Sequence, residues 1–135
     1  MNWEYSCGAV VYTRRNGRIL YVLVEEASGK FSFPKGHIEG DETEMDTARR
    51  EIFEETGLSP AFVEGFCLRD TYALREKPGT SKQVTYFLAE FGEEQLIPRE
   101  GEIMSIRLLP FEEAYPLFNA NNQRVLQEAH AFLNP

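Results

Sequence analysis

The chain has 135 residues, enough for one domain with a buried core and too few for two comfortable ones. Its apolar content of 42% suits a soluble globular protein, and no apolar run reaches the roughly 18 residues of a membrane span. The net charge of −8 argues against nucleic-acid polymers, whose phosphates are bound by clustered lysine and arginine. The N-terminus lacks the basic start and apolar stretch of a secretory signal. We therefore expect a single cytoplasmic domain over residues 1–135 without a membrane or nucleic-acid partner.

Two β-branched and aromatic runs predict the first strands. Residues 7–13 and 19–25 are separated by a segment containing Asn16 and Gly17, a pair that favours a tight β-hairpin. Residues 31–33 form a third, shorter extended piece. Residues 34–40 contain proline and two glycines, so we expect a loop that leads into a helix.

A helix is predicted over about residues 42–56. Asp41 and Glu44 have the spacing of a capping box, and Gly57 supplies a left-handed stop. At about 100° per residue, the apolar positions fall on one side of this helix. The side chains expected to face the core are Met45, Ala48, Ile52 and Thr56.

The second half of the chain predicts more strands and a closing helix. Residues 62–74 and 83–91 have the pattern of longer strands, joined by a turn over residues 76–81. Residues 105–109 form another short strand, and residues 123–133 carry apolar side chains at helical spacing. Strands that alternate with helices on this scale predict an α/β fold with a mixed sheet covered by helices.

The two cysteines, Cys7 and Cys67, lie far apart in apolar surroundings. They form no Cys-x-x-Cys pair, and no histidine cluster stands near either of them. We therefore expect buried free thiols rather than zinc ligands.

The predicted helix also has an acidic side. Residues 39–55 contain eight acidic and two basic residues, a net charge of −6. Carboxylates three and four residues apart repel one another, so a bound cation would relieve this helix, although a solvated surface is the alternative explanation. Oxygen ligands without nearby histidine or cysteine favour magnesium or manganese. The carboxylates that converge are those of Glu44, Glu51, Glu54 and Glu55.

A longer pattern surrounds this helix. Gly36 is followed after five residues by Glu42 and, after seven more, by Arg50-Glu51-Ile52-Phe53-Glu54-Glu55-Thr56-Gly57-Leu58. This pattern resembles the Nudix box at every defining position. The resemblance implies an α/β/α sandwich around a mixed sheet and a magnesium-dependent hydrolase, with manganese able to substitute. The substrate would be a nucleoside diphosphate linked to another group, and Glu42 would be structural rather than catalytic.

The same resemblance implies roles for residues of the box. Glu51, Glu54 and Glu55 would be metal ligands, and either Glu51 or Glu54 would act through water as the general base. Gly36 would offer its backbone carbonyl to the metal. Arg50 would orient the neighbouring carboxylates, a role that suits it because it lies one turn before Glu54 on the same side of the helix.

Segments outside the box resemble one group within this family, the asymmetric diadenosine tetraphosphatases. They are residues 6–12, 34–37, 86–90 and 126–133. By this resemblance Lys35 and Lys82 would contact phosphates, with a solvated turn lysine as the alternative for Lys82.

The same resemblance implies that four further residues belong to the site. Tyr72 would stack on an adenine, and Phe118 lies near a second stacking aromatic of the group. The alternatives are a half-buried strand aromatic for Tyr72 and a core residue for Phe118. His37 would either donate to a phosphate or cap the loop, and Glu102 falls near a position that often supplies a further metal-binding carboxylate.

The expected function is hydrolysis of a nucleoside polyphosphate, with diadenosine tetraphosphate cut into ATP and AMP as the leading substrate. The alternatives are a pyrophosphohydrolase of nucleoside triphosphates or RNA 5′ ends, and a nucleotide-sensing module without catalysis. A sensor is expected to have a broken box, whereas every catalytic position is filled here. The partner is thus a small nucleotide, and both a monomer and a homodimer remain open.

Overall fold

The structure is a computed structural model that describes residues 2–98 and 103–135. Strands alternate with helices along the chain, as the sequence predicts, and none of the described helices is long and apolar enough to cross a membrane. The elements are β1 (Asn2–Arg15), β2 (Arg18–Glu26), β3 (Phe31–Ser32), β4 (Lys35–His37), α1 (Glu44–Thr56), β5 (Ala61–Phe62), β6 (Leu68–Ala73), β7 (Thr80–Glu90), β8 (Ile103–Pro110), α2 (Phe111–Ala114), the 3₁₀ turn η1 (Tyr115–Leu117) and α3 (Ala120–Leu133).

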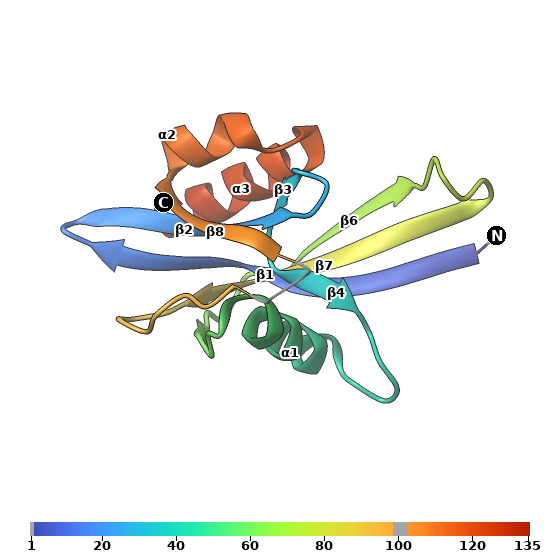
Figure 1. Cartoon of the computed structure of the whole chain (residues 1–135), viewed down its shortest axis with the longest axis horizontal. Coiled ribbons are helices and arrows are strands. Elements are labelled where there is room, and N and C mark those ends of the chain that lie inside the picture. The colour runs from blue at the N-terminus through green and yellow to red at the C-terminus, as the bar shows by residue number, and fades with distance from the viewer. Residues whose placement is uncertain (1, 99–102) are drawn as a thin grey trace.

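The strands form one mixed sheet between two layers of helices. Its central path runs β3-β2-β1-β7-β5, and β4, β6 and β8 pair with β1, β7 and β2 respectively. β1 and β7 run parallel, whereas the other pairs are antiparallel. α1 covers one face of the sheet, and α2 and α3 cover the other (Figure 1). The predicted α/β/α sandwich is confirmed.

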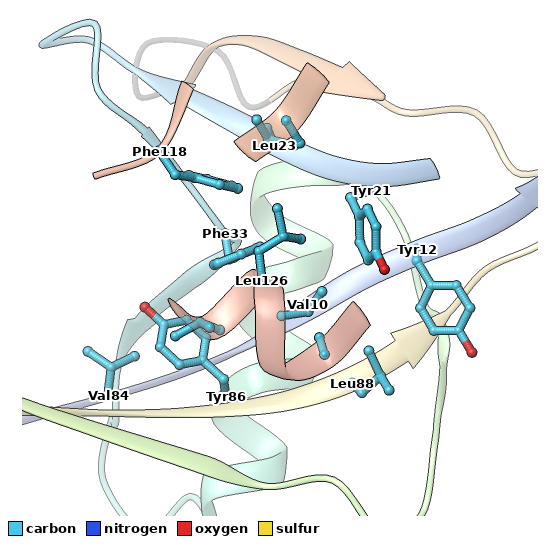
Figure 2. Close-up of a cluster of buried hydrophobic side chains, with 13 residues drawn as sticks. Val10, Tyr12, Tyr21, Leu23, Phe33, Val84, Tyr86, Leu88, Phe118 and Leu126 are labelled. Atoms are coloured by element: carbon cyan, nitrogen blue, oxygen red, sulfur yellow. The ribbon is translucent and has the colours of Figure 1, made fainter. Parts of the chain in front are cut away.

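The core has two layers because β1 is buried on both faces. Val10 belongs to the cluster under α3, and its neighbour Val11 belongs to the cluster under α1. Successive side chains of a strand point to opposite faces, so a central strand reads as a continuous apolar run. Figure 2 shows the α3-side cluster, to which Val10, Phe33 and Leu126 belong.

β1 changes its antiparallel partner along its length, and the sheet forks there. Residues 6–8 pair with β4, whereas residues 12–15 pair with β2. β2 continues with β3 and β8 as its neighbours. The prediction of a loop over residues 34–40 is therefore wrong for β4. Gly8 permits this strand, because a Cβ atom at Gly8 would overlap the carbonyl oxygen of Pro34.

Other boundaries also differ from the prediction. The expected strand over residues 62–74 is divided into β5 and β6, and Gly65 between them has a φ of 94°, outside the range of a strand. α1 begins at Glu44 rather than at residue 42. Its N-cap is Thr43, which forms a capping box with Asp46, so the cap predicted at Asp41 is wrong.

Burial confirms most of the expected core and corrects two points. Ala48, Ile52 and Thr56 are buried as predicted, while Met45, at the edge of the helix face, is only half-buried. Cys7 is buried, but Cys67 is exposed because it lies in the connection that precedes β6.

Candidate active site

α1 presents its glutamates from a firmly anchored helix. Ile52 and its buried neighbours fix one side of α1 against the sheet. Gly57, with a φ of 77°, ends the helix, and its N–H donates to the carbonyl of Phe53. The opposite side carries Glu51 and Glu54, whose side chains are 12% and 34% exposed. The carboxylates therefore stand on a rigid support and remain accessible.

Arg50 connects the carboxylates of the box. Its guanidinium donates to Glu42 at 2.7 Å, Glu51 at 2.8 Å and Glu54 at 3.3 Å, and also to the carbonyl of His37 at 2.9 Å. The hydrogen bond from Arg50 lowers the pKa of Glu42 to about 2, so Glu42 is ionised and serves as an anchor for Arg50. The predicted structural role of Glu42 agrees with this geometry.

Gly36 packs directly against Glu51. It lies in β4 opposite Cys7 of β1, and a Cβ atom at this position would overlap the carboxylate of Glu51. The absence of a side chain lets β4 and the acidic side of α1 come into contact. The backbone of β4 thus forms one wall of the carboxylate cluster.

Glu55 completes the cluster and is the most strongly perturbed carboxyl group in it. Burial and the charge of Glu51 raise its pKa to about 8, and the two side chains share a hydrogen bond. Burial also raises the pKa of Glu51. The protein itself thus leaves these carboxylates with too little positive charge, which is the electrostatic condition that a bound divalent cation relieves.

The donor set suits a hard cation. Glu51, Glu54 and Glu55 offer carboxylate oxygens, the ligands that magnesium and manganese prefer. Within residues 2–98 and 103–135, no three acidic, histidine or cysteine side chains already form a metal cluster, and Arg50 bridges two of these glutamates. Glu44 is engaged elsewhere, by Arg69 at 2.6 Å and Thr85 at 2.7 Å. The proposed ligand Glu102 lies outside the described residues.

A cleft of about 800 Å³ lies on the α3 side of the sheet. Its walls contain four basic and two acidic residues, a local excess of positive charge in a chain whose net charge is −8. A second hollow of about 430 Å³ reaches Glu55 and shares Glu26 and Lys35 with the cleft. Lys35 therefore borders both spaces. The charged and aromatic lining residues of the cleft are Glu26, Lys30, Lys35, Tyr72, Arg75, Glu76, Lys82 and Tyr86.

Three residues predicted for substrate binding meet in this cleft. Tyr72 of β6 stands opposite Lys82 of β7 in the strand register, and Lys35 of β4 lies in the same wall. Burial lowers the pKa of Lys82, and it lowers that of Lys35 to about 8. Among the described residues, no carboxylate forms a salt bridge with either lysine.

Two predicted residues lie outside the cleft. Phe118 is 5% exposed and packs on Phe33 with ring centroids 4.6 Å apart, so it belongs to the core rather than to a stacking site (Figure 2). The side chain of His37 is exposed beside Glu4, in a separate hollow with Tyr5. Its backbone carbonyl, rather than its imidazole, contacts the site by accepting from Arg50.

The sequence analysis did not predict the other wall of the cleft. Asn119, Asn121 and Asn122 line it from the start of α3. Asn119 is the N-cap of α3, which an asparagine before an amphipathic run could have indicated. The placement of α3 beside β6 depends on packing and could not be derived from local pattern.

The fold and the box define the class of this protein. Residues 5–129 match the NUDIX domain family, and the chain belongs to the Nudix hydrolases, which cut phosphoanhydride bonds. It is 33% identical to the asymmetrical bis(5′-nucleosyl)-tetraphosphatase of Mus musculus, across 95% of this chain and 94% of the relative. The Sus scrofa enzyme of the same name is 34% identical over the same shares.

A solved structure supports the fold. The crystal structure of a C. elegans Ap4A hydrolase binary complex superimposes with a TM-score of 0.89 and covers 97% of this chain and 98% of its own. The two sequences are 24% identical. The arrangement of the sheet and the three helices is thus the arrangement of this neighbour.

Proposed function

We propose that this Nudix protein hydrolyses diadenosine tetraphosphate to ATP and AMP, with magnesium as cofactor and manganese as a substitute. The observation that carries this proposal is a pair of adjoining hollows with Lys35 in the wall of both, one lined by Glu55 and the other by Tyr72 and Lys82. This pair places a carboxylate cluster next to a basic, aromatic cleft large enough for a nucleotide. The mouse and pig relatives, named as asymmetrical bis(5′-nucleosyl)-tetraphosphatases, support the same substrate.

The residues that carry this reaction belong to the carboxylate cluster on one side of Lys35 and to the cleft on the other. Glu51, Glu54 and Glu55 hold the cation together with the backbone carbonyl of Gly36. When bound, the cation polarises phosphoryl oxygens and makes an attacking water more acidic. Either Glu51 or Glu54 accepts the proton of that water. Arg50 orients both carboxylates through the hydrogen bonds that it donates to them.

The basic, aromatic cleft binds the substrate. Lys35 and Lys82 contact phosphates, and their incomplete compensation by protein carboxylates leaves their charge available for that purpose. Tyr72 stacks on an adenine, and its half-buried position on β6 fixes the plane of its ring. The chemistry therefore depends on α1 and the choice of substrate on β4, β6 and β7.

Incubation of the wild-type protein with diadenosine tetraphosphate and magnesium, followed by chromatography, tests the reaction. We expect ATP and AMP, and two molecules of ADP would contradict the position of the cut. Comparison of kcat/KM with that for nucleoside triphosphates and triphosphorylated RNA tests the substrate. A higher kcat/KM for either of these than for diadenosine tetraphosphate would make it the preferred substrate and contradict the proposal.

Glu54→Gln tests the site, because it removes a negative charge and keeps the size of the side chain. We expect kcat to fall by roughly 10²- to 10⁴-fold, with an unchanged circular dichroism spectrum. Glu64→Gln is the matched control, since Glu64 is exposed and lies outside the site, between β5 and β6. Activity of Glu54→Gln near that of the control would remove Glu54 from the mechanism.

A further inference from the structure

We propose that Asn122 recognises the nucleotide base by donating a hydrogen bond from its side-chain amide to a ring nitrogen of the purine that stacks on Tyr72. This inference rests on the proposed function, which places a base on Tyr72. Tyr72 is proposed to contact the face of the base, and Lys35 and Lys82 the phosphates of the nucleotide. Asn122 would contact the edge of the base. The box and the segments that resemble diadenosine tetraphosphatases do not contain Asn122.

The first observation is that the side chain of Asn122 is buried and opens only toward the cleft. Asn122 is 5% exposed and lines the cleft that also contains Tyr72 and Lys82. Among the described residues, Ser6 Oγ is the one buried side-chain nitrogen or oxygen without a hydrogen-bond partner. Within residues 2–98 and 103–135, Asn122 Nδ2 also has no hydrogen-bond partner. Because it is not among the fully buried unpartnered atoms, it retains access to solvent. At a residue so deeply buried, that access comes through the cleft.

The second observation is that the amide oxygen of Asn122 faces the hydroxyl of Tyr86. The hydroxyl of Tyr86 donates to Asn122 Oδ1 at 3.4 Å, which directs Nδ2 away from Tyr86. The backbone N–H of Asn122 donates to the N-cap side chain of Asn119 at 2.9 Å. The amide thus belongs to a preorganised first turn of α3, and presenting its donor costs little conformational entropy.

The third observation places Asn122 beside Tyr72. Arg124, two residues after Asn122 on α3, donates to Asp70 of β6 at 2.7 Å. Asp70 and Tyr72 are two residues apart on one strand and therefore point to the same face of the sheet. The ion pair holds the start of α3 against the segment of β6 that carries Tyr72. Tyr72 and Asn122 line the same cleft, so a base that stacks on Tyr72 shares this space with the amide of Asn122.

These observations fit a purine better than a phosphate as the partner of Asn122. A neutral amide contributes no charge, and the basic residues of the same cleft already supply cations for phosphates. Asparagine matches the donor and acceptor pattern on the edge of adenine, whose ring nitrogens accept hydrogen bonds. A buried donor that loses its partner pays the cost of desolvation, so this contact discriminates among bases.

A double-mutant cycle between protein and ligand tests the contact. Calorimetry would measure the binding of AMP and of its 1-deaza, 3-deaza and 7-deaza analogues, each of which lacks one ring-nitrogen acceptor. We expect wild-type protein to bind one of the three analogues roughly tenfold more weakly than AMP. In Asn122→Asp, which removes the donor but keeps an acceptor for Tyr86, AMP and that analogue should bind equally.

Asn121→Asp is the matched control, because it places the same charge in the same cleft at an exposed position. It should shift the affinity for AMP and for the analogues by one common factor. If Asn122→Asp weakened the binding of AMP and of all three analogues by the same factor, while the wild type still bound AMP and hydrolysed the substrate, only the role of Asn122 would be overturned. Failure of the wild type to bind AMP and to hydrolyse any nucleotide would overturn the proposed function as well.

Discussion

The lack of a side chain at Gly36 sets the geometry of the carboxylate cluster. A methyl group at this position would overlap the carboxylate of Glu51, which Arg50 holds by a hydrogen bond of 2.8 Å. Gly36→Ala must therefore displace either the carboxylate or the backbone of β4. Misplacing a catalytic group by about 1 Å can cost about a hundredfold in rate. We expect kcat/KM for the nucleotide substrate to fall by about that factor.

The matched control for this change is Gly92→Ala. The nearest atom to a Cβ there is the carboxylate of Glu94 at 3.2 Å, the mobile end of an exposed side chain. Steady-state kinetics should give Gly92→Ala the wild-type rate. If Gly36→Ala retained kcat/KM within twofold of wild type, the contact with Glu51 would have no catalytic importance.

At the scale of single residues, the sequence predicted what depends on local spacing. Arg50 and Glu54 are four residues apart on a helix, and the structure brings them within 3.3 Å. Asn122 and Tyr72 line one cleft because β6 and α3 pack together. Local sequence pattern does not predict that packing. The burial of Phe118, which agrees with the core alternative, likewise depends on a residue distant in sequence, Phe33.

At the scale of elements, the start of α1 offers a direct test of helix capping. Thr43 accepts from the N–H of Asp46 at 3.1 Å, and Asp46 accepts in return from the N–H of Thr43. Thr43→Ala should lower the free energy of unfolding by about 1 kcal/mol, because it leaves an N-terminal N–H of the helix without its partner. Urea denaturation followed by circular dichroism measures this loss.

Two further variants make the capping test specific. Thr43→Ser keeps a hydroxyl acceptor and should retain most of the stability. Asp41→Ala, at the position that the sequence had suggested for the cap, should leave the midpoint of unfolding nearly unchanged. A larger loss in Asp41→Ala than in Thr43→Ala would contradict the assignment of the N-cap.

The elements themselves were largely predictable, and the reasons for the exceptions are physical. The hairpin, α1 and the last helix follow from Asn16-Gly17, from Gly57 and from apolar spacing, all of which act locally. β4 is only three residues long and exists because Gly8 admits its backbone, a tertiary requirement. The break between β5 and β6 depends on the positive φ of Gly65, which a single sequence does not reveal.

At the scale of the whole molecule, the fork in the sheet explains how one site uses both of its faces. α1 and its glutamates lie on one face, while Tyr72 and Asn122 line the cleft on the other. At the fork the chain passes from β3, which pairs with β2, to β4, which pairs with β1. Lys35 at the start of β4 borders both hollows. The sheet thus separates the carboxylates of α1 from the cationic cleft, and Lys35 borders the hollows of both.

The proposed cation should couple this arrangement to stability, because a ligand that binds only the folded state raises the free energy of unfolding. At a magnesium concentration a hundred times Kd, the gain is about 2.7 kcal/mol, and Tm rises by several degrees. Glu55→Gln removes one of the proposed ligands and should reduce this rise in thermal denaturation with and without magnesium. Sodium chloride is used to bring every sample to the same total ionic strength, so that binding at the site is distinguished from general screening of charge.

Glu113→Gln provides the matched control for the magnesium experiment. It removes the same charge from α2, on the opposite side of the sheet from α1, where Glu113 is exposed. Its Tm should rise with magnesium as much as that of the wild type. The comparison is made at a pH above about 8, the raised pKa of Glu55, where both variants remove one negative charge. A difference between them then measures the cation at α1 and not the overall charge. Equal rises in Glu55→Gln and Glu113→Gln would place the cation elsewhere.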